Sequence, residues 1–304
     1  MQSYTECIPC FVRQAYDALR QVTQDDEALV HRALQRVMRE AAEFPLSCSP
    51  PAMAQTTHRI IREETGHPDP YAAIKAESTR IALELAKEAR ELIAAAIDPF
   101  KMALRFSIAG NIMDFALMAN WDRLELGSFI ETTRLQPLDD GDVEKFRTAV
   151  KQARTILFLG DNAGEAVFDQ LLIEQLGGAD VCYAVKGGPI INDATLEDAL
   201  AAGLDHVAEL VENGSDAPGT ILDDCTDAFR RRFDEADLVV AKGQANYETL
   251  STCTRPLFFL TRVKCPVIAR DIGEPVGSWI VKEHRVERPR SESPKSKRPK
   301  GIVS

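Results

Sequence analysis

TILFLGDNAGEAVFD (residues 155–169) contains the transition that decides the fold. An apolar run ends at Gly160, an acid and an amide follow at Asp161 and Asn162, and a helical apolar pattern begins after Gly164. A buried strand that leads directly into a helix is the repeating unit of a parallel α/β sheet. The stretch therefore predicts a strand whose carboxyl end presents two polar side chains.

The rest of the chain divides into three parts around this unit. Four further β-rich runs, VCYAV, HVAEL, LVVA and LFFLT, alternate with helical stretches and predict a Rossmann-like three-layer α/β/α domain with a mainly parallel sheet over residues 125–284. Residues 1–124 show helical apolar spacing throughout and predict an all-α N-terminal domain. Residues 285–304 hold seven basic and two acidic side chains with few apolar ones, which predicts a disordered basic tail.

The composition excludes several classes of protein. With 45% apolar and 27% charged residues in 304, the chain is globular rather than fibrous or disulfide-dense. A net charge of -11 argues against nonspecific binding to nucleic acid or to an anionic membrane. No apolar run approaches the roughly 20 residues of a membrane span, and seven cysteines without a secretory leader favour the cytoplasm. The oligomeric state stays open.

Polar residues follow each of the predicted strands. Ligands of open parallel sheets bind beyond the carboxyl ends of the strands, so residues at these ends are candidates for a site. Besides Asp161 and Asn162, the strand ends supply Lys186, Gly187, Asn192, Asp193, Lys242, Gly243, Asn246, Arg262 and Lys264.

This combination suits a hard divalent cation bridged to a phosphate group. Mg²⁺ is commonly held by one or two carboxylates together with phosphate oxygens and water, and Asp161 and Asp193 fit that number. Asn162 offers a neutral oxygen, and Lys186 and Lys242 offer positive charge for the phosphate. Such ligands admit Mg²⁺ or Mn²⁺, and also Co²⁺ or Ni²⁺.

Each feature also has a structural explanation. An Asp or Asn before a helix is often only an N-cap, lysines after strands are often solvated, and Gly-Gly-Pro commonly forms a turn. Three strands that end in the same kinds of residue at one edge favour a site over three unrelated accidents.

Several segments resemble the damage-control phosphatase family, specifically a branch with an N-terminal C-x-x-C pair. The similar segments are GDNAGEAVFD, KGGPIINDAT, VVAKGQANYETL, AGNIMDF and the N-terminal CIPC, and the resemblance spans residues 7–279. It implies a metal-dependent phosphatase, a phosphoric monoester hydrolase, that acts on small phosphorylated metabolites such as sugar phosphates, with its active site between the two domains.

The resemblance also implies roles for individual residues. The metal ligands would be Asp161, Asn162 and Asp193, and Lys242 would complete the catalytic set by holding the phosphate. The residues expected to contact substrate or phosphate are Asn111, Asp114, Gly164, Glu165, Lys186, Gly187, Asn192, Gly243, Asn246 and Lys264. Water is the expected nucleophile because the D-x-D signature of aspartyl-phosphate enzymes is absent after Asp161, although a covalent route through Asp161 remains an alternative.

Cys7 and Cys10 have the spacing of a metal-binding or redox pair. A structural zinc site needs four ligands, and the sequence holds no second C-x-x-C, so Cys48 and His58 are the nearest candidates to complete it. The competing interpretation is a pair of thiols packed in the first helix.

Two other functions are compatible with the sequence. Carboxyl methyltransferases that use S-adenosylmethionine share strand-end acids and glycine turns, but they need no metal set. A non-catalytic phosphometabolite-binding protein on an enzyme-like scaffold would bind ligand without turnover. The histidines are scattered, and neither a P-loop nor a G-x-G-x-x-G fingerprint is present.

Overall fold

The computed structural model describes residues 1–23, 26–111 and 123–285, so Asp114 and nearly all of the predicted tail lie outside the described part. The helices that precede the sheet are α1 (Cys7–Thr23), α2 (Glu27–Glu43), α3 (Pro50–Thr65), α4 (Ala72–Ala95), α5 (Pro99–Gly110), α7 (Arg123–Leu135) and α8 (Asp140–Gln152). The sequence predicted helical structure for residues 1–124 as a whole, and α1 to α5 agree with it. Helix α3 begins at the Pro50-Pro51 pair because proline is tolerated in a first helical turn.

The remaining elements alternate between strands and helices. They are β1 (Thr155–Leu159), α9 (Glu165–Ile173), β2 (Asp180–Val185), α10 (Leu196–Ala201), β3 (Glu209–Glu212), α11 (Asp227–Glu235), β4 (Leu238–Lys242), α12 (Gly243–Leu250), β5 (Leu257–Arg262), α13 (Pro266–Ile272) and β6 (Trp279–His284), with short 3-10 turns at Leu204–His206 and Leu222–Asp224.

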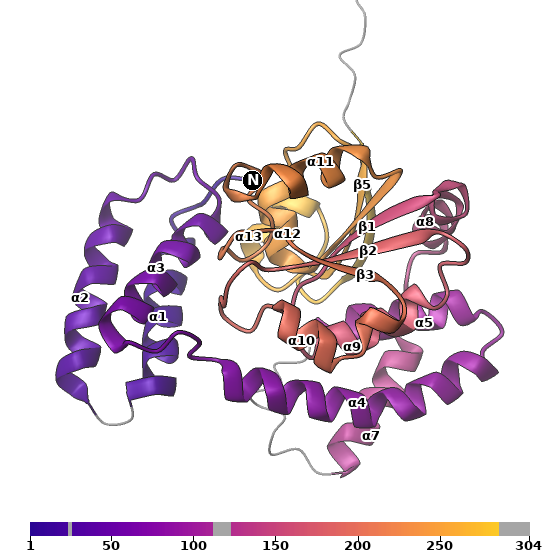
Figure 1. The fold of residues 1–304 in the computed structure, drawn as a ribbon, viewed down its shortest axis with the longest axis horizontal. Helices are drawn as coiled ribbons and strands as arrows, with labels where there is room; N and C mark the ends of the chain where they lie inside the picture. The colour runs from indigo at the N-terminus through magenta and orange to yellow at the C-terminus, as the bar shows by residue number, and fades with distance from the viewer. Residues whose placement is uncertain (24–25, 112–122, 286–304) are drawn as a thin grey trace, which may run out of the picture.

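One sheet with the strand order β3-β2-β1-β4-β5-β6 forms the centre of the fold. The first five strands are parallel, and only β6 pairs antiparallel, at the β5 edge. Alternate residues of β1 point to opposite faces, so Phe158 packs with α5 and α9 on one side and Leu159 packs with the α11–α13 side. The predicted three-layer architecture with a mainly parallel sheet is confirmed (Figure 1).

The apolar cores divide the chain at a different place from the predicted boundary at residue 124. Helices α4 and α5 bury Leu85, Phe106 and their neighbours in the same core as the sheet. Only α1, α2 and α3 share a separate core, around Leu19, Val37 and Ile61. In Figure 1 these three helices stand beside the sheet, while α4 runs beneath it.

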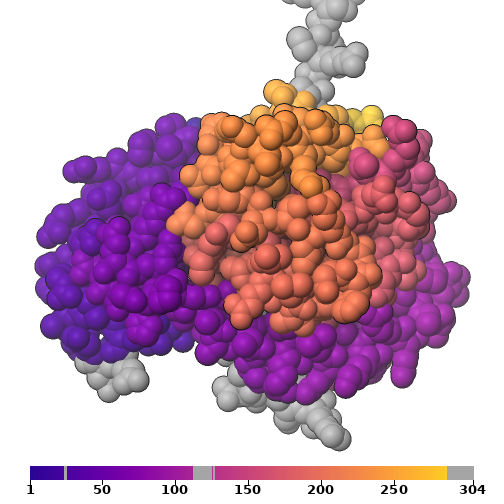
Figure 2. Space-filling view, in the orientation of Figure 1, coloured from indigo at the N-terminus to yellow at the C-terminus, as the bar shows by residue number. Residues whose placement is uncertain are grey.

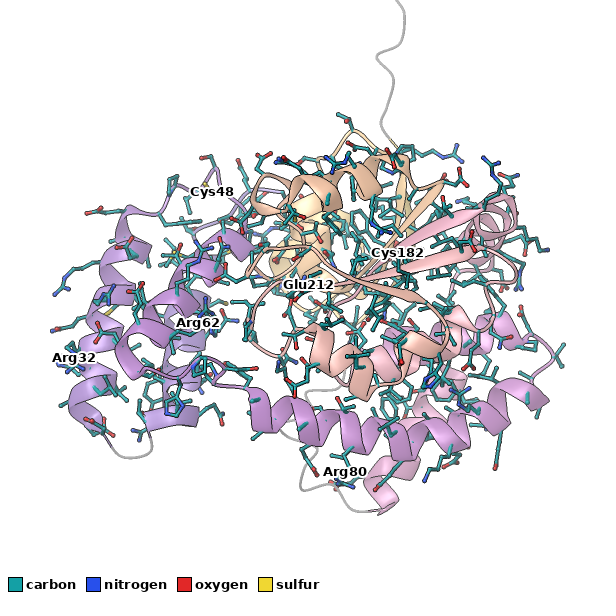
Figure 3. The ribbon with its side chains drawn as sticks, viewed as in Figure 1. Arg32, Cys48, Arg62, Arg80, Cys182 and Glu212 are labelled. Atoms are coloured by element: carbon teal, nitrogen blue, oxygen red, sulfur yellow. The ribbon has the colours of Figure 1, made fainter. Side chains whose placement is uncertain are left out.

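Helix α3 ties the three-helix bundle to the loops of the α/β layer. Arg59 and Arg62 both pair with Asp216, with N–O distances of 2.5 Å, and Arg62 also donates to the Pro189 carbonyl at 2.9 Å. In Figure 3 Arg62, a residue of α3, is labelled on the side of the bundle that faces the α/β part. Figure 2 shows the two parts packed against each other. The bundle is thereby fixed next to the loops that follow β2 and β3.

Among the described residues, none of the helices is both long and apolar enough to cross a bilayer.

Candidate active site at the strand ends

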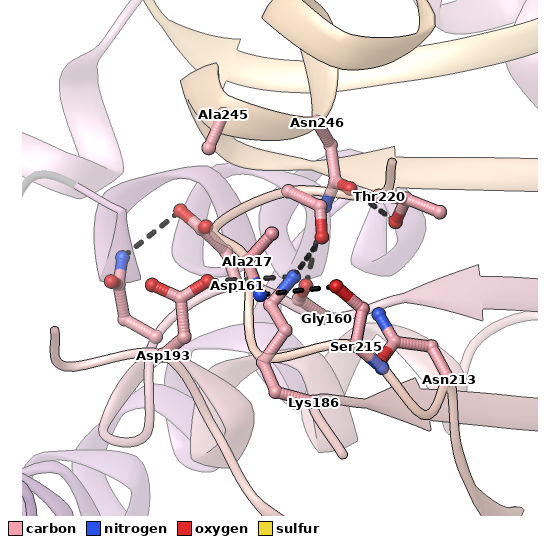
Figure 4. A network of polar contacts seen from close by, with 12 residues as sticks. Gly160, Asp161, Lys186, Asp193, Asn213, Ser215, Ala217, Thr220, Ala245 and Asn246 are labelled. Atoms are coloured by element: carbon pink, nitrogen blue, oxygen red, sulfur yellow. Dashed lines mark hydrogen bonds and ion pairs between the residues drawn. The ribbon is translucent and has the colours of Figure 1, made fainter. Parts of the chain in front are cut away.

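The turn after β1 and the loop after β2 are joined by backbone hydrogen bonds. The Ala194 N–H donates to the Asp161 carbonyl at 2.7 Å, the Ala163 N–H donates to the Asn192 carbonyl at 2.9 Å, and Asn162 and Asp193 form an isolated antiparallel bridge. Because β1 and β2 are parallel neighbours, their carboxyl ends meet at one edge of the sheet. The structure therefore brings Asp161, Asn162 and Asp193 together. Figure 4 shows Asp161 and Asp193 side by side.

Three buried carboxylates lie at this point. Asp161, Glu165 and Asp193 are each at most 5% exposed. The Asn111 amide nitrogen donates to Asp161 Oδ2 at 2.6 Å and to Glu165 Oε2 at 3.0 Å, and the Asn162 amide nitrogen donates to the same two oxygens at 3.1 and 3.0 Å. Two amides from different elements therefore bridge one carboxylate pair.

Burial and mutual repulsion disfavour the charged forms of the carboxyl groups in this cluster. Burial, then the charges of Glu165 and Asp193, raise the pKa of Asp161 to about 8. Burial also raises the pKa of Asp193, against the opposing effect of Lys186. Asp193 Oδ2 has no hydrogen bond, although Lys186 Nζ lies 3.4 Å away at ion-pair distance. A bound cation would relieve both a carboxylate oxygen without a hydrogen bond and raised carboxyl pKa values.

Lys242 does not lie where the sequence predicted. Its side chain is fully buried behind the cluster, and its ammonium donates to Glu165 Oε1 at 2.5 Å, to the Ser107 carbonyl at 2.9 Å and to Asp169. An ammonium has three hydrogens, and all three are used. This geometry assigns Lys242 to holding Glu165 in place, and no donor is left for a phosphate.

Asp169 extends the buried network away from the site. It accepts hydrogen bonds from Ser107 Oγ at 2.7 Å and from the Tyr183 hydroxyl at 3.0 Å, besides the contact with Lys242. Burial raises the pKa of Asp169 to about 6, and the charge of Lys242 opposes that rise. Neither Asp169 nor Tyr183 was expected from the sequence, because nothing local marks two residues of separate elements as partners.

The close contact with Asp161 requires a glycine at position 243. Its φ is +77°, in the region that favours glycine, and a Cβ at this position would lie 1.9 Å from Asp161 Oδ2. The residue lets β4 turn into α12 directly against the carboxylate.

We predict that Gly243→Ala lowers the phosphate release that the sequence resemblance implies at least tenfold. The new methyl group must displace Asp161, and in a catalytic site a shift of about 1 Å costs about 10²-fold. Gly273→Ala is the matched control, since Gly273 has a φ of +83° but open space around its Cβ position. Steady-state kinetics of both variants distinguish the clash from backbone strain, and equal activities would contradict the assignment.

A cavity of about 300 Å³ opens onto the carboxylates. The strand ends contribute Asp161, Asn162 and Asp193, and the opposite wall comes from α1 and α3, with Cys10, Gln14, Pro50 and Ala54 among its residues. The predicted placement between the helical part and the α/β part agrees with this lining. Lys264 is exposed at the mouth, and Asn192 lines the same cavity.

Other predicted contact residues have structural roles here. Asn246 donates to the carbonyls of Lys242 and Gly160 at 2.7 and 3.2 Å and accepts from Thr220, so its amide is fully occupied. Gly187 packs against the backbone of Gly214. Gly164 is the buried N-cap of α9, which begins at Glu165.

Two cavity residues were missed by the sequence analysis. Glu248 is buried, and burial raises its pKa to about 7, against Gln244 and Lys264. Ile191 has a φ of 45°, and a β-branched residue in this region is a strained outlier that occurs mainly at functional sites. No pattern of neighbouring residues signals either property.

Another cavity, of about 650 Å³, lies at the opposite end of the sheet, beside Thr155, Asp180 and Arg232. It lacks a group of buried carboxylates, so the chemistry favours the strand-end cavity in spite of its smaller volume.

The residues fit a cation that takes some of its ligands from the protein and the others from substrate and water, rather than one held only by protein side chains. Within the described ranges, no group of three or more His, Cys, Asp or Glu side chains is arranged to hold a metal ion by itself. The predicted set has two carboxylates and one amide, and the unpaired Asp193 Oδ2 is among them. The same finding means that Cys48 and His58 do not complete a zinc site with Cys7 and Cys10. Cys7 is buried, whereas Cys10 lines the cavity.

Comparisons with known proteins agree with this geometry. The family model described as the damage-control phosphatase ARMT1-like domain matches residues 3–280. A damage-control phosphatase of Archaeoglobus fulgidus is 36% identical, over 91% of this chain and 97% of its own, and damage-control phosphatase PH1575 of Pyrococcus horikoshii is 31% identical, over 92% and 97%. The crystal structure of the Pyrococcus horikoshii protein, titled a DUF89 family protein, superposes with a TM-score of 0.86 at 30% identity and covers 94% of this chain and 100% of its own. The chain therefore belongs to the damage-control phosphatase ARMT1-like family.

Proposed function

We propose that this chain is a metal-dependent phosphatase that hydrolyses small phosphorylated metabolites at the strand-end cavity. The observation that carries the proposal is the group of buried carboxylates around Asp161 and Asp193, which lie close together with raised pKa values beside a cavity. The names of the two phosphatase relatives support the same class of substrate.

Asp161, Asp193 and Asn162 would hold the cation, with Mg²⁺ or Mn²⁺ favoured by their oxygen ligands and Co²⁺ or Ni²⁺ as alternatives. When bound, the cation would polarise the phosphoryl group and acidify water for in-line attack.

The other residues of the site position these groups and offset charge. Asn111 bridges Asp161 and Glu165 through its amide, and Lys242 holds Glu165 from behind. Lys186, which donates to the Gly219 carbonyl and faces Asp193, and Lys264, which lies at the mouth, supply positive charge for the phosphate. Preorganised charge of this kind is the largest contribution to most phosphoryl-transfer rates.

Direct attack by water is the favoured route, because Asp161 is enclosed by two amide donors and by Gly243. A covalent phosphoryl intermediate on Asp161 would be revealed by labelled phosphate trapped on acid-quenched protein, and its detection would overturn this part of the proposal.

The test is phosphate release from a panel of phosphorylated metabolites, measured after chelation and after adding back each divalent cation. We expect no release from chelated protein and recovery with at least one of Mg²⁺, Mn²⁺, Co²⁺ or Ni²⁺. Full activity in excess chelator, or no release with any cation, would contradict the proposal.

A further inference from the structure

The strand-end cavity continues into a second, outer cavity of about 810 Å³. Six residues line both, namely Cys10, Gln14, Asn162, Ile191, Asn192 and Lys264. A ligand whose phosphate lies at Asp161 and Asp193 therefore has space to extend outward, and the residues of the outer cavity meet the part of the substrate that is not cleaved.

The two cavities differ in their charged residues. Asp161, Asp193 and Glu248 line the inner one together with Lys264, so acids outnumber bases there. Arg262 lines only the outer cavity, beside Lys264, on the wall contributed by β5 and the loop after it. Arg13, on the facing wall from α1, pairs with Asp17 at 2.9 Å and its charge is locally balanced. The positive side chains of the outer cavity that form no ion pair among the described residues, Arg262 and Lys264, therefore lie on the β5 side.

Arg262 is half-buried and lacks a partner for the buried part of its guanidinium. Its Nε is buried without a hydrogen bond, and within the described residues neither its side chain nor that of Lys264 makes a hydrogen bond or an ion pair. By contrast, Arg59 and Arg62 both pair with Asp216. A buried donor left unpaired is unfavourable, so an unsatisfied one beside a cavity points to a ligand that satisfies it.

The order of the strands places Arg262 at a distance from the carboxylates that one small ligand can span. Strand β4 separates β1 from β5, so the backbones of the two strands lie roughly 10 Å apart at about 4.8 Å per strand. Asn111 links the two ends, because it donates to Asp161 Oδ2 and its own Oδ1 lies 3.5 Å from Thr261 Oγ1, one residue before Arg262. A small metabolite can therefore contact both Arg262 and the strand-end carboxylate cluster.

We propose that Arg262, with Lys264 beside it, binds a second anionic group of the substrate. The substrate class is then a phosphomonoester that carries a carboxylate or a second phosphate at its far end. Arginine suits this role because its planar fork matches both groups bidentately. The inference rests on the proposed phosphatase function and narrows its substrates.

The experiment compares two phosphomonoesters that differ mainly in a carboxylate, 3-phosphoglycerate and glycerol 1-phosphate. We expect the native protein to show kcat/KM for phosphoglycerate at least about tenfold above that for glycerol phosphate, the size expected for one charge-assisted contact. Arg262→Gln should bring this ratio close to one, and Arg262→Lys should retain part of it. Arg80→Gln, on the outer side of α4 in Figure 3, is the matched control and should keep both the ratio and the activity.

The outcomes separate this inference from the proposed function. A native ratio of one or below, or a ratio that survives in Arg262→Gln, overturns the second-anion site even if both esters are hydrolysed. If neither ester is hydrolysed with any cation, calorimetric titration with the same two compounds decides. Tighter binding of phosphoglycerate that is lost in Arg262→Gln supports the site without the activity, and equal binding overturns it.

Discussion

Replacing Asp161 with asparagine should lower kcat/KM for phosphate release by about 10³-fold or more, the loss seen when a group that stabilises transition-state charge is removed. The change preserves the shape of the side chain, and an asparagine oxygen can still accept from Asn111 and Asn162. It removes the charge through which this residue would hold a cation. Steady-state kinetics at saturating metal measure the effect.

The same substitution should leave the metal-free protein folded and at least as stable as the native protein. Asp161 is buried beside Glu165 and Asp193, so neutralising it removes repulsion between like charges. Urea unfolding of the chelated protein measures this. Asp180→Asn is the control, because Asp180 is exposed at the start of β2, at the opposite end of the strand from the site. An active Asp161→Asn protein would refute the assigned site.

Lys242→Met should destabilise the protein by about 3–5 kcal/mol, because removing one partner from a buried ion pair leaves uncompensated charge. Here the carboxylates that lose their ion-pair partner are those of Glu165 and Asp169, both fully buried. At roughly 2–4 °C per kcal/mol for a chain of this kind, Tm should fall by about 10 °C. Thermal unfolding by circular dichroism is the measurement.

Lys75→Met provides the comparison for this prediction. Lys75 is also buried between two carboxylates, Asp69 and Asp198, at 2.8 Å each, but it does not line the strand-end cavity. Both variants should lose stability, and only Lys242→Met should also lose turnover through the freed Glu165. A Lys242→Met protein with native Tm and a raised KM would instead restore the phosphate-binding role that the sequence suggested.

The sequence predicted those features that depend on strand order and strand ends. Alternating β-rich and helical runs indicate a parallel sheet, and parallel strands bring their carboxyl ends to one edge. The sequence therefore predicted that Asp161 and Asn162 lie near Asp193, which comes about thirty positions later in the chain. The structure brings the three residues together. The cap of α5 is equally local in the sequence: Pro99 follows Asp98, whose side chain accepts from the Lys101 N–H.

Side-chain direction beyond the strand end was not predictable. Lys242 ends β4, as Asp161 lies just after β1, yet its side chain turns inward because Glu165 and Asp169 from α9 and the Ser107 carbonyl from α5 surround it. Those partners come from elements distant in sequence. For the same reason, neither the unpaired Nε of Arg262 nor the positive φ of Ile191 leaves a trace in the local pattern.

The predicted division at residue 124 reflected composition rather than packing. Residues before it are helical throughout, but helix content does not tell which core a helix joins. The apolar faces of α4 and α5 pack on α9 and the sheet, whereas α1 to α3 pack on one another.

Anomalous scattering from crystals grown with Mn²⁺ and inorganic phosphate would locate the cation itself. We expect a single strong peak within bonding distance of Asp161, Asn162 and Asp193, with phosphate on its cavity side and no such peak in Asp161→Asn crystals. Metal-dependent phosphate release in solution, together with a manganese peak elsewhere and none at these three residues, would contradict it.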